Sequence, residues 1–249
     1  MKRLEGQVAI VTGSGQGIGA AIAMTLANEG ASLVVAELLE ANGSAVQKNI
    51  EQAGGTAISH PTDISEESSV NEMLRVSMDR FGKVDILVNN AGIYPVTPVE
   101  DMAEEEWDRV IGTNLFGTFL CSRAIVPHLL ERKQGRIISI TSGRGLQGAK
   151  NGAHYASSKG GIIGFTKSLA LELAPAGITV NCICPGVSDT AQPRGHSTEE
   201  ELYAKGATIP LGRIGQPEDI AKAAAFLASA RAKFVTGQTV LVNGGGVMW

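Results

Sequence analysis

The stretch VAIVTGSGQGIG, residues 8–19, decides the fold of this chain. A short apolar run, typical of a buried parallel strand, leads directly into glycines spaced G-x-x-x-G-x-G from Gly13 to Gly19. Glycines at such a turn allow close approach of the backbone to a pyrophosphate and close packing of the next helix. The start of that helix presents free N–H groups to an anion. The stretch therefore predicts a strand–turn–helix unit that binds a dinucleotide.

Glu37 supports that prediction, because it follows the second apolar run of the chain. A carboxylate there accepts hydrogen bonds from the adenosine ribose hydroxyls. A 2′-phosphate would be repelled by it, and the neighbours Ser14, Gln16 and Leu38 are not basic. The sequence predicts NAD rather than NADP as cofactor, with an exposed strand-end carboxylate as the structural alternative for Glu37.

Outward from this stretch, short apolar runs alternate with longer helical patterns to the end of the chain. The runs are apolar on both faces, as in a buried parallel sheet. Strands are expected at residues 8–12, 32–36, 57–60, 86–89, 136–141, 179–183 and 239–242. Helices are expected at 18–29, 41–53, 66–81, 104–132, 152–173 and 217–228. This alternation predicts one α/β domain over 1–249: a doubly wound, Rossmann-type parallel sheet of about seven strands with helices on both faces.

Composition limits the functional classes. The 249 residues are 43% apolar and 18% charged, with a net charge of −4, so the chain can bury a full core. The chain has no basic run of the kind that binds nucleic acid and no evident signal peptide. It also has no apolar segment of about 18 residues that would span a membrane. The three cysteines and four histidines lack metal-ligand spacing. A soluble, cytoplasmic protein without metal, nucleic-acid or membrane partners is expected.

Tyr155 and Lys159 lie four residues apart on a predicted helix, so they share one face. A cation beside a phenol stabilises the phenolate and lowers its pKa towards neutrality. Ser142 follows a predicted strand and supplies a second hydroxyl that could hold a substrate oxygen. These groups predict proton transfer to or from an alcohol or ketone, with an amphipathic surface pair as the alternative.

Together these motifs resemble the short-chain dehydrogenase/reductase family over nearly the whole chain. The matching positions are Thr12–Gly19, Asp63, 89–92, Asn114, Ser142, Tyr155 with Lys159, 185–186 and Thr190. The resemblance implies that Tyr155 is the general acid/base and that Ser142 orients the substrate oxygen. It implies that Lys159 binds the nicotinamide ribose and lowers the Tyr155 pKa, and that Asn114 holds a water in a proton relay.

The resemblance also implies the ligand contacts. The cofactor would be bound by Tyr155 and Lys159 together with Gly13, Gln16, Gly17, Ile18, Gly19, Glu37, Asp63, Ile64, Asn90, Ala91, Gly92, Pro185, Gly186, Val187 and Thr190. The positions beside the motifs that would face substrate are Tyr94, Ser142, Arg144, Gln147, Asn151 and His154. Residues 186–213 follow a strand and are expected to form a substrate lid.

The resemblance implies an NAD(H)-dependent enzyme that interconverts a secondary alcohol and a ketone. The fairly polar substrate set favours a diol, a sugar or polyol, or a hydroxy acid, and the absence of a basic residue at Gln16 favours oxidation in catabolism. The alternative is a 3-oxoacyl-thioester reductase or 3-hydroxyacyl dehydrogenase, because residues 210–213, PLGR, resemble those reductases. Such biosynthetic enzymes usually carry a basic residue at the Gln16 position and use NADPH. A non-catalytic, NAD-binding regulator is the alternative of a different class.

Relatives of this kind commonly form homotetramers, so the resemblance implies a homotetramer here. The chain ends in an apolar segment, Val247, Met248 and Trp249. An apolar tail that ends in tryptophan favours an interface. We expect it to reach a neighbouring subunit near its lid.

Overall fold

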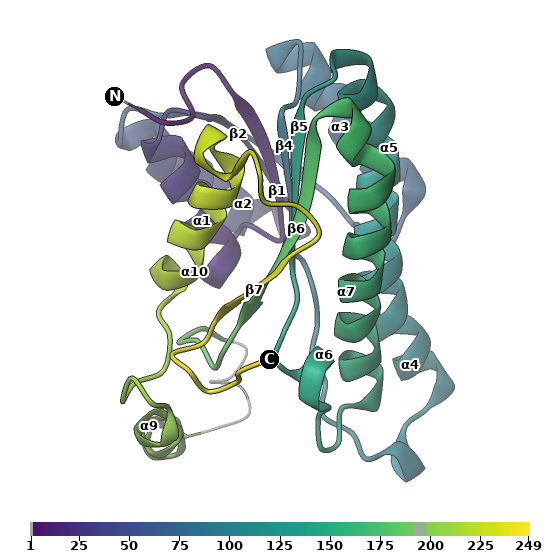
Figure 1. Cartoon of the computed structure of the whole chain (residues 1–249), viewed down its shortest axis with the longest axis vertical. Coiled ribbons are helices and arrows are strands. Elements are labelled where there is room, and N and C mark those ends of the chain that lie inside the picture. The colour runs from purple at the N-terminus through teal and green to yellow at the C-terminus, as the bar shows by residue number, and fades with distance from the viewer. Residues whose placement is uncertain (1, 192–194, 196–197) are drawn as a thin grey trace.

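Apolar runs buried on both faces form a parallel sheet in the computed structural model, which describes residues 2–191, 195 and 198–249. Within those residues the seven strands have the order β3-β2-β1-β4-β5-β6-β7, and every neighbouring pair is parallel (Figure 1). They are β1 (Val8–Thr12), β2 (Ser32–Glu37), β3 (Thr56–Pro61), β4 (Ile86–Asn89), β5 (Gly135–Ile140), β6 (Ile178–Pro185) and β7 (Thr239–Val242). The predicted single α/β domain is confirmed.

Helices cover both faces of the sheet (Figure 1). One core forms with α1 (Gly17–Asn28), α2 (Glu40–Gln52) and α10 (Pro217–Ala228). The other forms with α3 (Glu67–Phe81), α5 (Gly117–Arg132) and α7 (Ala153–Leu173). Side chains of β1 alternate between the two cores, with Val8 and Ile10 in one and Ala9 and Val11 in the other. This alternation explains why each strand is apolar along its whole length.

Shorter elements complete the described fold. The long helix expected at 104–132 is interrupted: α4 (Glu104–Ile111) leads into a π turn, η2 (Gly112–Phe116), before α5. The other helices are α6 (Arg144–Gln147) and α9 (Glu199–Thr208). Single 3₁₀ turns are η1 (Val99–Asp101), η3 (Ala174–Ala176) and η4 (Ala230–Ala232).

The continuous helical run Glu104–Arg132 differs from the expectation that no segment has the composition of a membrane span. Among the described residues it is the one helix whose length and hydropathy would allow it to cross a membrane. A buried core helix meets the same criteria. Leu120, Ile125 and Leu129 of this run are fully buried in the core between α3, α5 and α7, which accounts for its apolar composition.

Strand order reverses between β1 and β4, because β2 and β3 lie on one side of β1 whereas the later strands lie on the other. The loops that leave the carboxyl ends of these two central strands diverge to opposite faces of the sheet. A crevice therefore opens at their ends, and the candidate site lies there.

Candidate functional site

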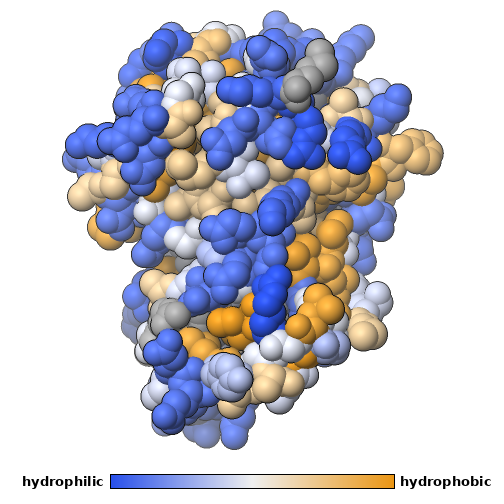
Figure 2. Space-filling view, turned by 90° about the vertical axis from the view of Figure 1, so that its left-hand side faces the viewer, coloured by the Kyte–Doolittle hydropathy of each residue, from blue (hydrophilic) through white to orange (hydrophobic). Residues whose placement is uncertain are grey.

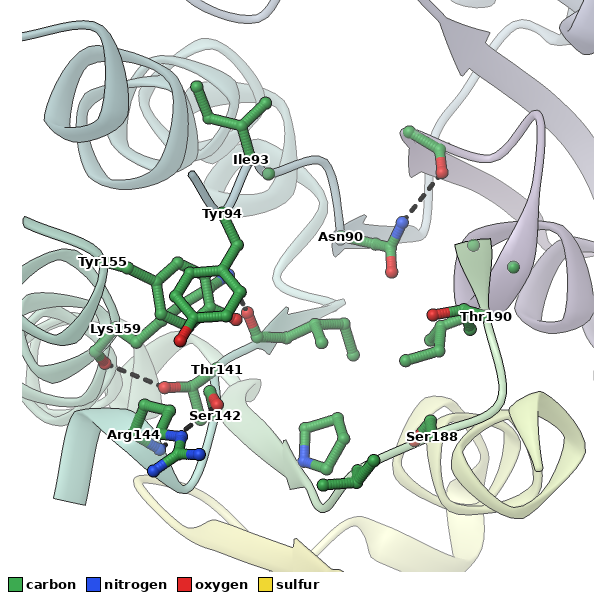
Figure 3. A pocket seen from close by; sticks show the side chains of 18 of the residues that line it. Asn90, Ile93, Tyr94, Thr141, Ser142, Arg144, Tyr155, Lys159, Ser188 and Thr190 are labelled. Carbon is green, nitrogen blue, oxygen red and sulfur yellow. Dashed lines mark hydrogen bonds between the residues drawn. The ribbon is translucent and has the colours of Figure 1, made fainter. Parts of the chain in front are cut away.

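A cavity of about 840 Å³ opens at the carboxyl ends of β1, β4, β5 and β6. Figure 3 shows Tyr94, Tyr155 and Lys159 on one side of it, with Asn90 and Thr190 on the other. The position matches the general rule that open α/β sheets bind ligands beyond their carboxyl strand ends at the switch in strand order.

The turn between β1 and α1 is so tightly packed that it requires glycine. Gly13 and Gly17 have φ of +59° and +54°. A Cβ on Gly19 would lie 2.2 Å from the Gly13 carbonyl oxygen, and one on Gly13 would lie 2.7 Å from the Ala91 Cα. Asn90 clamps the turn, because its Nδ2 donates to the carbonyl oxygens of Thr12 at 3.0 Å and Gly13 at 2.9 Å.

The start of α1 is arranged to bind an anion. Gly17, Ile18 and Gly19 line the cavity, and no side-chain hydrogen bond caps this helix at Gln16. The first N–H groups of an uncapped helix attract negative charge. The turn therefore fits the pyrophosphate of a dinucleotide.

Glu37 is fixed beside this turn. Its Oε2 accepts a hydrogen bond from the Gly15 N–H at 2.8 Å, and its Oε1 accepts one from the Leu39 N–H at 3.2 Å. A Cβ on Gly15 would lie 2.7 Å from the Glu37 Cγ, so the carboxylate packs directly on the turn. The described cationic residues that line the cavity come from other elements, namely Arg144 on α6, Lys159 on α7 and Lys205 on α9.

Three of the four candidate catalytic side chains, Ser142, Tyr155 and Lys159, converge on one corner of the cavity. Tyr155 is 8% exposed on α7 and shares a hydrogen bond with the Ser142 hydroxyl at the end of β5. Lys159 is one helical turn further on, with its Nζ 5.7 Å from the centre of the Tyr155 ring. The Tyr94 ring covers Tyr155, with ring centres 4.2 Å apart (Figure 3). The structure thus brings the predicted side chains together.

The protonation of this corner differs from the expectation. Burial raises the pKa of Tyr155 to about 12, although the hydrogen bond with Ser142 acts in the opposite direction. Burial also lowers the pKa of Lys159 to about 8, and the Lys159 Nζ donates to the Ile140 carbonyl oxygen at 2.9 Å. Loss of hydration is thus the largest influence on the phenol, larger than the hydrogen bond with Ser142. Tyr155 is a protonated phenol at neutral pH in this arrangement, suited to give up a proton.

Asn114 lies behind this corner, in the π turn η2, and does not line the cavity. Its Oδ1 accepts from the Ile93 N–H at 2.8 Å, and its Nδ2 donates to the Ile93 carbonyl at 3.0 Å and the Ser158 hydroxyl at 3.1 Å. The Ser158 hydroxyl donates to the Tyr155 carbonyl at 2.8 Å. Asn114 thus connects the loop after β4 to the first turn of α7. Single π turns inside helices frequently mark functional sites.

Two predicted substrate residues also lie outside the cavity lining. His154 is fully buried: its Nδ1 accepts from the Tyr155 N–H at 2.8 Å. Its Nε2 therefore carries the ring proton and donates to Glu106 at 3.1 Å, which leaves neither nitrogen for a substrate. Asn151 is exposed at φ +57°, and its carbonyl accepts from the Thr97 N–H at 2.8 Å. Both hold the start of α7 in place instead.

Glu106 belongs to the same anchoring group. Hydrogen bonds from the Thr97 hydroxyl and then from His154 hold the pKa of this carboxyl below its usual range. The group ties α4, the start of α7 and the loop that carries Tyr94 to one another. Sequence reasoning misses it because its members are far apart along the chain.

Every other predicted ligand residue lines the cavity. They are Gly13, Gln16, Gly17, Ile18, Gly19, Glu37, Asp63, Ile64, Asn90, Ala91, Gly92, Tyr94, Ser142, Arg144, Gln147, Tyr155, Lys159, Pro185, Gly186, Val187 and Thr190. Part of the expected lid does so too, at Ser188, Ala191, Lys205, Thr208 and Ile209. Residues 192–194 and 196–197 of that segment lie outside the described residues.

Several lining residues are not signalled by the sequence. They include Leu38, Thr62, Val96, Thr113, Asn243 and Val247. None belongs to a recognisable motif, and tertiary packing alone brings them to the cavity. Val247 is notable because it comes from the last three residues of the chain.

Comparisons with known proteins find a family model and full-length relatives that are named as acyl-carrier-protein reductases. A family model described as "Enoyl-(Acyl carrier protein) reductase" matches residues 13–246. The chain is 42% identical to a 3-oxoacyl-[acyl-carrier-protein] reductase of Vibrio cholerae, over 97% of this chain and 98% of that one. It is 41% identical over the full length of both chains to the Synechocystis enzyme of that name. For the Escherichia coli relative the identity is 42% over 97% of each chain.

These relatives overturn one expectation. The prediction of a catabolic enzyme for a diol, polyol or hydroxy acid is wrong, because the full-length relatives are named for reduction of a 3-oxoacyl group. The catabolic role rested on the absence of a basic residue at Gln16, and the substrate class rested on the polar substrate set. Two of its members, Asn151 and His154, do not reach the cavity.

The packing of Gly19 generates a testable prediction. In Gly19→Ala the new Cβ would meet the Gly13 carbonyl oxygen at 2.2 Å and the Asn90 Nδ2 at 2.5 Å, so the turn must shift. We expect the affinity for NADH, measured by fluorescence titration, to fall about tenfold or more, which is about 1.4 kcal/mol or more. Gly164→Ala on α7 is the control, because its Cβ would meet nothing within 4 Å. Equal affinity in the two variants would contradict the assigned turn.

Proposed function

The chain belongs to the short-chain dehydrogenase/reductase family, and on this premise we propose that it reduces a 3-oxoacyl thioester to the 3-hydroxyacyl thioester. The observation that carries the proposal is the similarity over nearly the whole chain to 3-oxoacyl-[acyl-carrier-protein] reductases. The protonated state of Tyr155 supports it, because reduction of a ketone needs a proton donor at the carbonyl oxygen.

The candidate residues have distinct roles in this proposal. Tyr155 donates its hydroxyl proton to the substrate carbonyl oxygen, and Ser142 holds that oxygen through its own hydroxyl. A reduced nicotinamide held by the residues around Pro185 and by Lys159 would supply the hydride for the carbonyl carbon. Lys159 provides a buried positive charge beside the phenol, and we assign it to the nicotinamide ribose. These groups act from rigid elements, which favours precise placement of the reacting oxygen.

Asn114 has a positioning role in the same proposal. Its side-chain amide is occupied by Ile93 and Ser158, and Ser158 in turn binds the Tyr155 carbonyl. This series of hydrogen bonds fixes the position of Tyr155 relative to the loop after β4. A water-mediated proton relay at Asn114 would have to operate while its side-chain amide keeps these hydrogen bonds.

We propose NAD(H) as the cofactor. Glu37 is held by two backbone N–H groups beside the glycine turn, which leaves its outer face to accept the adenosine ribose hydroxyls. A 2′-phosphate brought there would be repelled by the fixed carboxylate and would meet no cation from β2 or the turn. The remaining cavity residues around the turn and around Pro185 are assigned to the pyrophosphate, adenine and nicotinamide.

We also propose a cytoplasmic homotetramer. Large apolar side chains are exposed on the surface, among them Phe116 on η2, Leu171 on α7 and Phe234 in the connection before β7. Such surfaces suit contacts between copies of one chain. Light scattering in solution determines the number of subunits.

The proposed reaction predicts the behaviour of Tyr155→Phe. With a 3-oxoacyl thioester and NADH, we expect kcat to fall about 10²- to 10⁴-fold, because the proton donor is lost. Tyr203→Phe, on the exposed surface of α9, is the control. Retained turnover in Tyr155→Phe would overturn the assigned acid. Cofactor binding without turnover of any ketone by the wild type would favour the non-catalytic regulator.

Glu37 predicts cofactor preference. In Glu37→Ser we expect the ratio of kcat/KM with NADH to that with NADPH to fall about 10- to 100-fold, on the order of 1.4–2.8 kcal/mol. Glu40→Ser, exposed on α2 and outside the cavity, should keep the wild-type ratio. A wild-type preference for NADPH would contradict the role assigned to Glu37.

The pKa of Lys159 predicts how the reaction rate depends on pH in the alkaline range. Lys159 is charged below about pH 8 and neutral above it, whereas Tyr155 stays protonated until about pH 12. We expect kcat/KM for ketone reduction to decline as pH rises through about 8, while alcohol oxidation gains from phenolate formation at higher pH. Initial rates in both directions across alkaline pH test this. A reduction rate that rises through the same interval would contradict it.

A further inference from the structure

The last residues of the chain fold back onto the cavity of their own subunit. After β7, Gly244 and Gly245 adopt φ of +64° and +86° and reverse the chain. The Asn243 side chain holds the reversed segment at two points: its Oδ1 accepts from the Gly245 N–H at 3.0 Å, and its Nδ2 donates to the Val247 carbonyl at 2.9 Å. We call residues 243–249 the C-terminal tail.

On one side, the C-terminal tail packs against the segment that follows α9. The Leu211 N–H donates to the Gly244 carbonyl at 3.1 Å. A Cβ on Gly244 would lie 2.7 Å from the Ile209 Cγ2, and Ile209 lines the cavity. The tail is therefore joined to the far end of the expected lid.

On the other side, the tail reaches the residue next to Ser142. A Cβ on Gly143 would lie 3.2 Å from the Val247 Cγ2, and both residues line the cavity. In Figure 1 the C-terminus lies beside α6, close to the carboxyl end of β6. Val247 thus stands between the catalytic corner and the segment after α9.

The two residues after Val247 behave differently. Met248 and Trp249 are 80% and 77% exposed, and the Trp249 ring lies 5.3 Å from the Lys167 Nζ on α7. A cation over an indole ring contributes a modest attraction. Val247 is only half-buried at the cavity, while Trp249 attaches the end of the tail to the surface of α7.

The apolar character of this region suits an acyl chain. Figure 2 shows hydrophobic side chains gathered around a hollow in the lower half of the molecule, the half that contains α9 and the C-terminus in Figure 1. Val247 and Ile209 offer methyl groups and no hydrogen-bond donors to this end of the cavity. Such a wall discriminates substrates by size and shape rather than by hydroxyl groups.

We propose that Val247 is a specificity-determining residue, which closes the substrate end of the cavity in its own subunit and sets the length of acyl chain accepted. The proposal rests on the proposed function, because it takes the substrate to be a 3-oxoacyl thioester. The contacts of Gly244 and Val247 on which it rests lie within one chain, and the expectation that the end of the tail reaches a neighbouring subunit stays a separate prediction.

Activity with short and long 3-oxoacyl thioesters tests the proposal. In Val247→Ala we expect the kcat/KM ratio of long to short chains to rise about tenfold, and in Val247→Phe to fall by a similar factor. Met248→Ala is the matched control, because Met248 is 80% exposed and does not line the cavity. Unchanged ratios in both Val247 variants would overturn the proposal.

A second measurement works without turnover. The native cysteines, Cys121, Cys182 and Cys184, are all buried, so a thiol introduced into the tail is the accessible one. We expect a maleimide to label Val247→Cys several times more slowly than Met248→Cys, and more slowly again with NAD⁺ and a 3-oxoacyl thioester present, a pair that cannot react. Equal labelling of the two variants would overturn the placement of Val247.

The two measurements separate the proposal from the function on which it rests. If the wild type reduces no 3-oxoacyl thioester, the proposed function fails and the acyl-length role fails with it, whatever the labelling. If thioesters are reduced but the Val247 variants keep the wild-type chain-length ratio, the function stands and the role of Val247 alone is overturned. Altered ratios together with slow labelling support both.

Discussion

The close approach of three backbone segments at the end of β1 is the constraint on which the rest of the site depends. Gly13 touches Ala91 of the loop after β4, Gly19 touches the Gly13 carbonyl, and Asn90 ties these segments together. Any side chain at these glycines would separate α1 from the sheet. The approach places an uncapped helix start, a fixed carboxylate and the loop that carries Tyr94 around one crevice.

Desolvation is the second governing effect. The catalytic corner is nearly closed to water, so the charged forms of both Tyr155 and Lys159 are disfavoured there. A phenol kept protonated in such a place is a proton donor, which agrees with the reductases that the chain resembles over its length. The sequence suggested a phenolate because the spacing shows that a lysine is near the tyrosine. The spacing does not show that the Lys159 ammonium donates to the Ile140 carbonyl.

Much of the fold could be predicted because its signals are local. Strands buried on both faces are apolar throughout, and the glycine turn has a steric requirement visible in twelve residues. The anchoring of Tyr155 could not be predicted, since His154 looks like a substrate ligand until its burial and its partner Glu106 are known. The π turn around Asn114 likewise leaves no mark in an apolar helical pattern.

The substrate class was misjudged for a related reason. Residues near a motif in sequence, such as Asn151, are held by the backbone outside the cavity, whereas Ile209 and Val247 arrive from distant segments. The polar residues beside the motifs therefore did not represent the full set of side chains that line the substrate end of the cavity. Cofactor contacts are easier to predict from the sequence, because they belong to turns that directly follow the strands.

The C-terminal tail also has a consequence for biosynthesis of the protein. Domains generally begin to fold from the N-terminal side while the ribosome is still adding residues. The sheet and the dinucleotide crevice can assemble from strands β1 to β6 at that stage, whereas Val247 follows β7 and is added later. A nascent chain could therefore bind its cofactor before the wall of its substrate cavity exists.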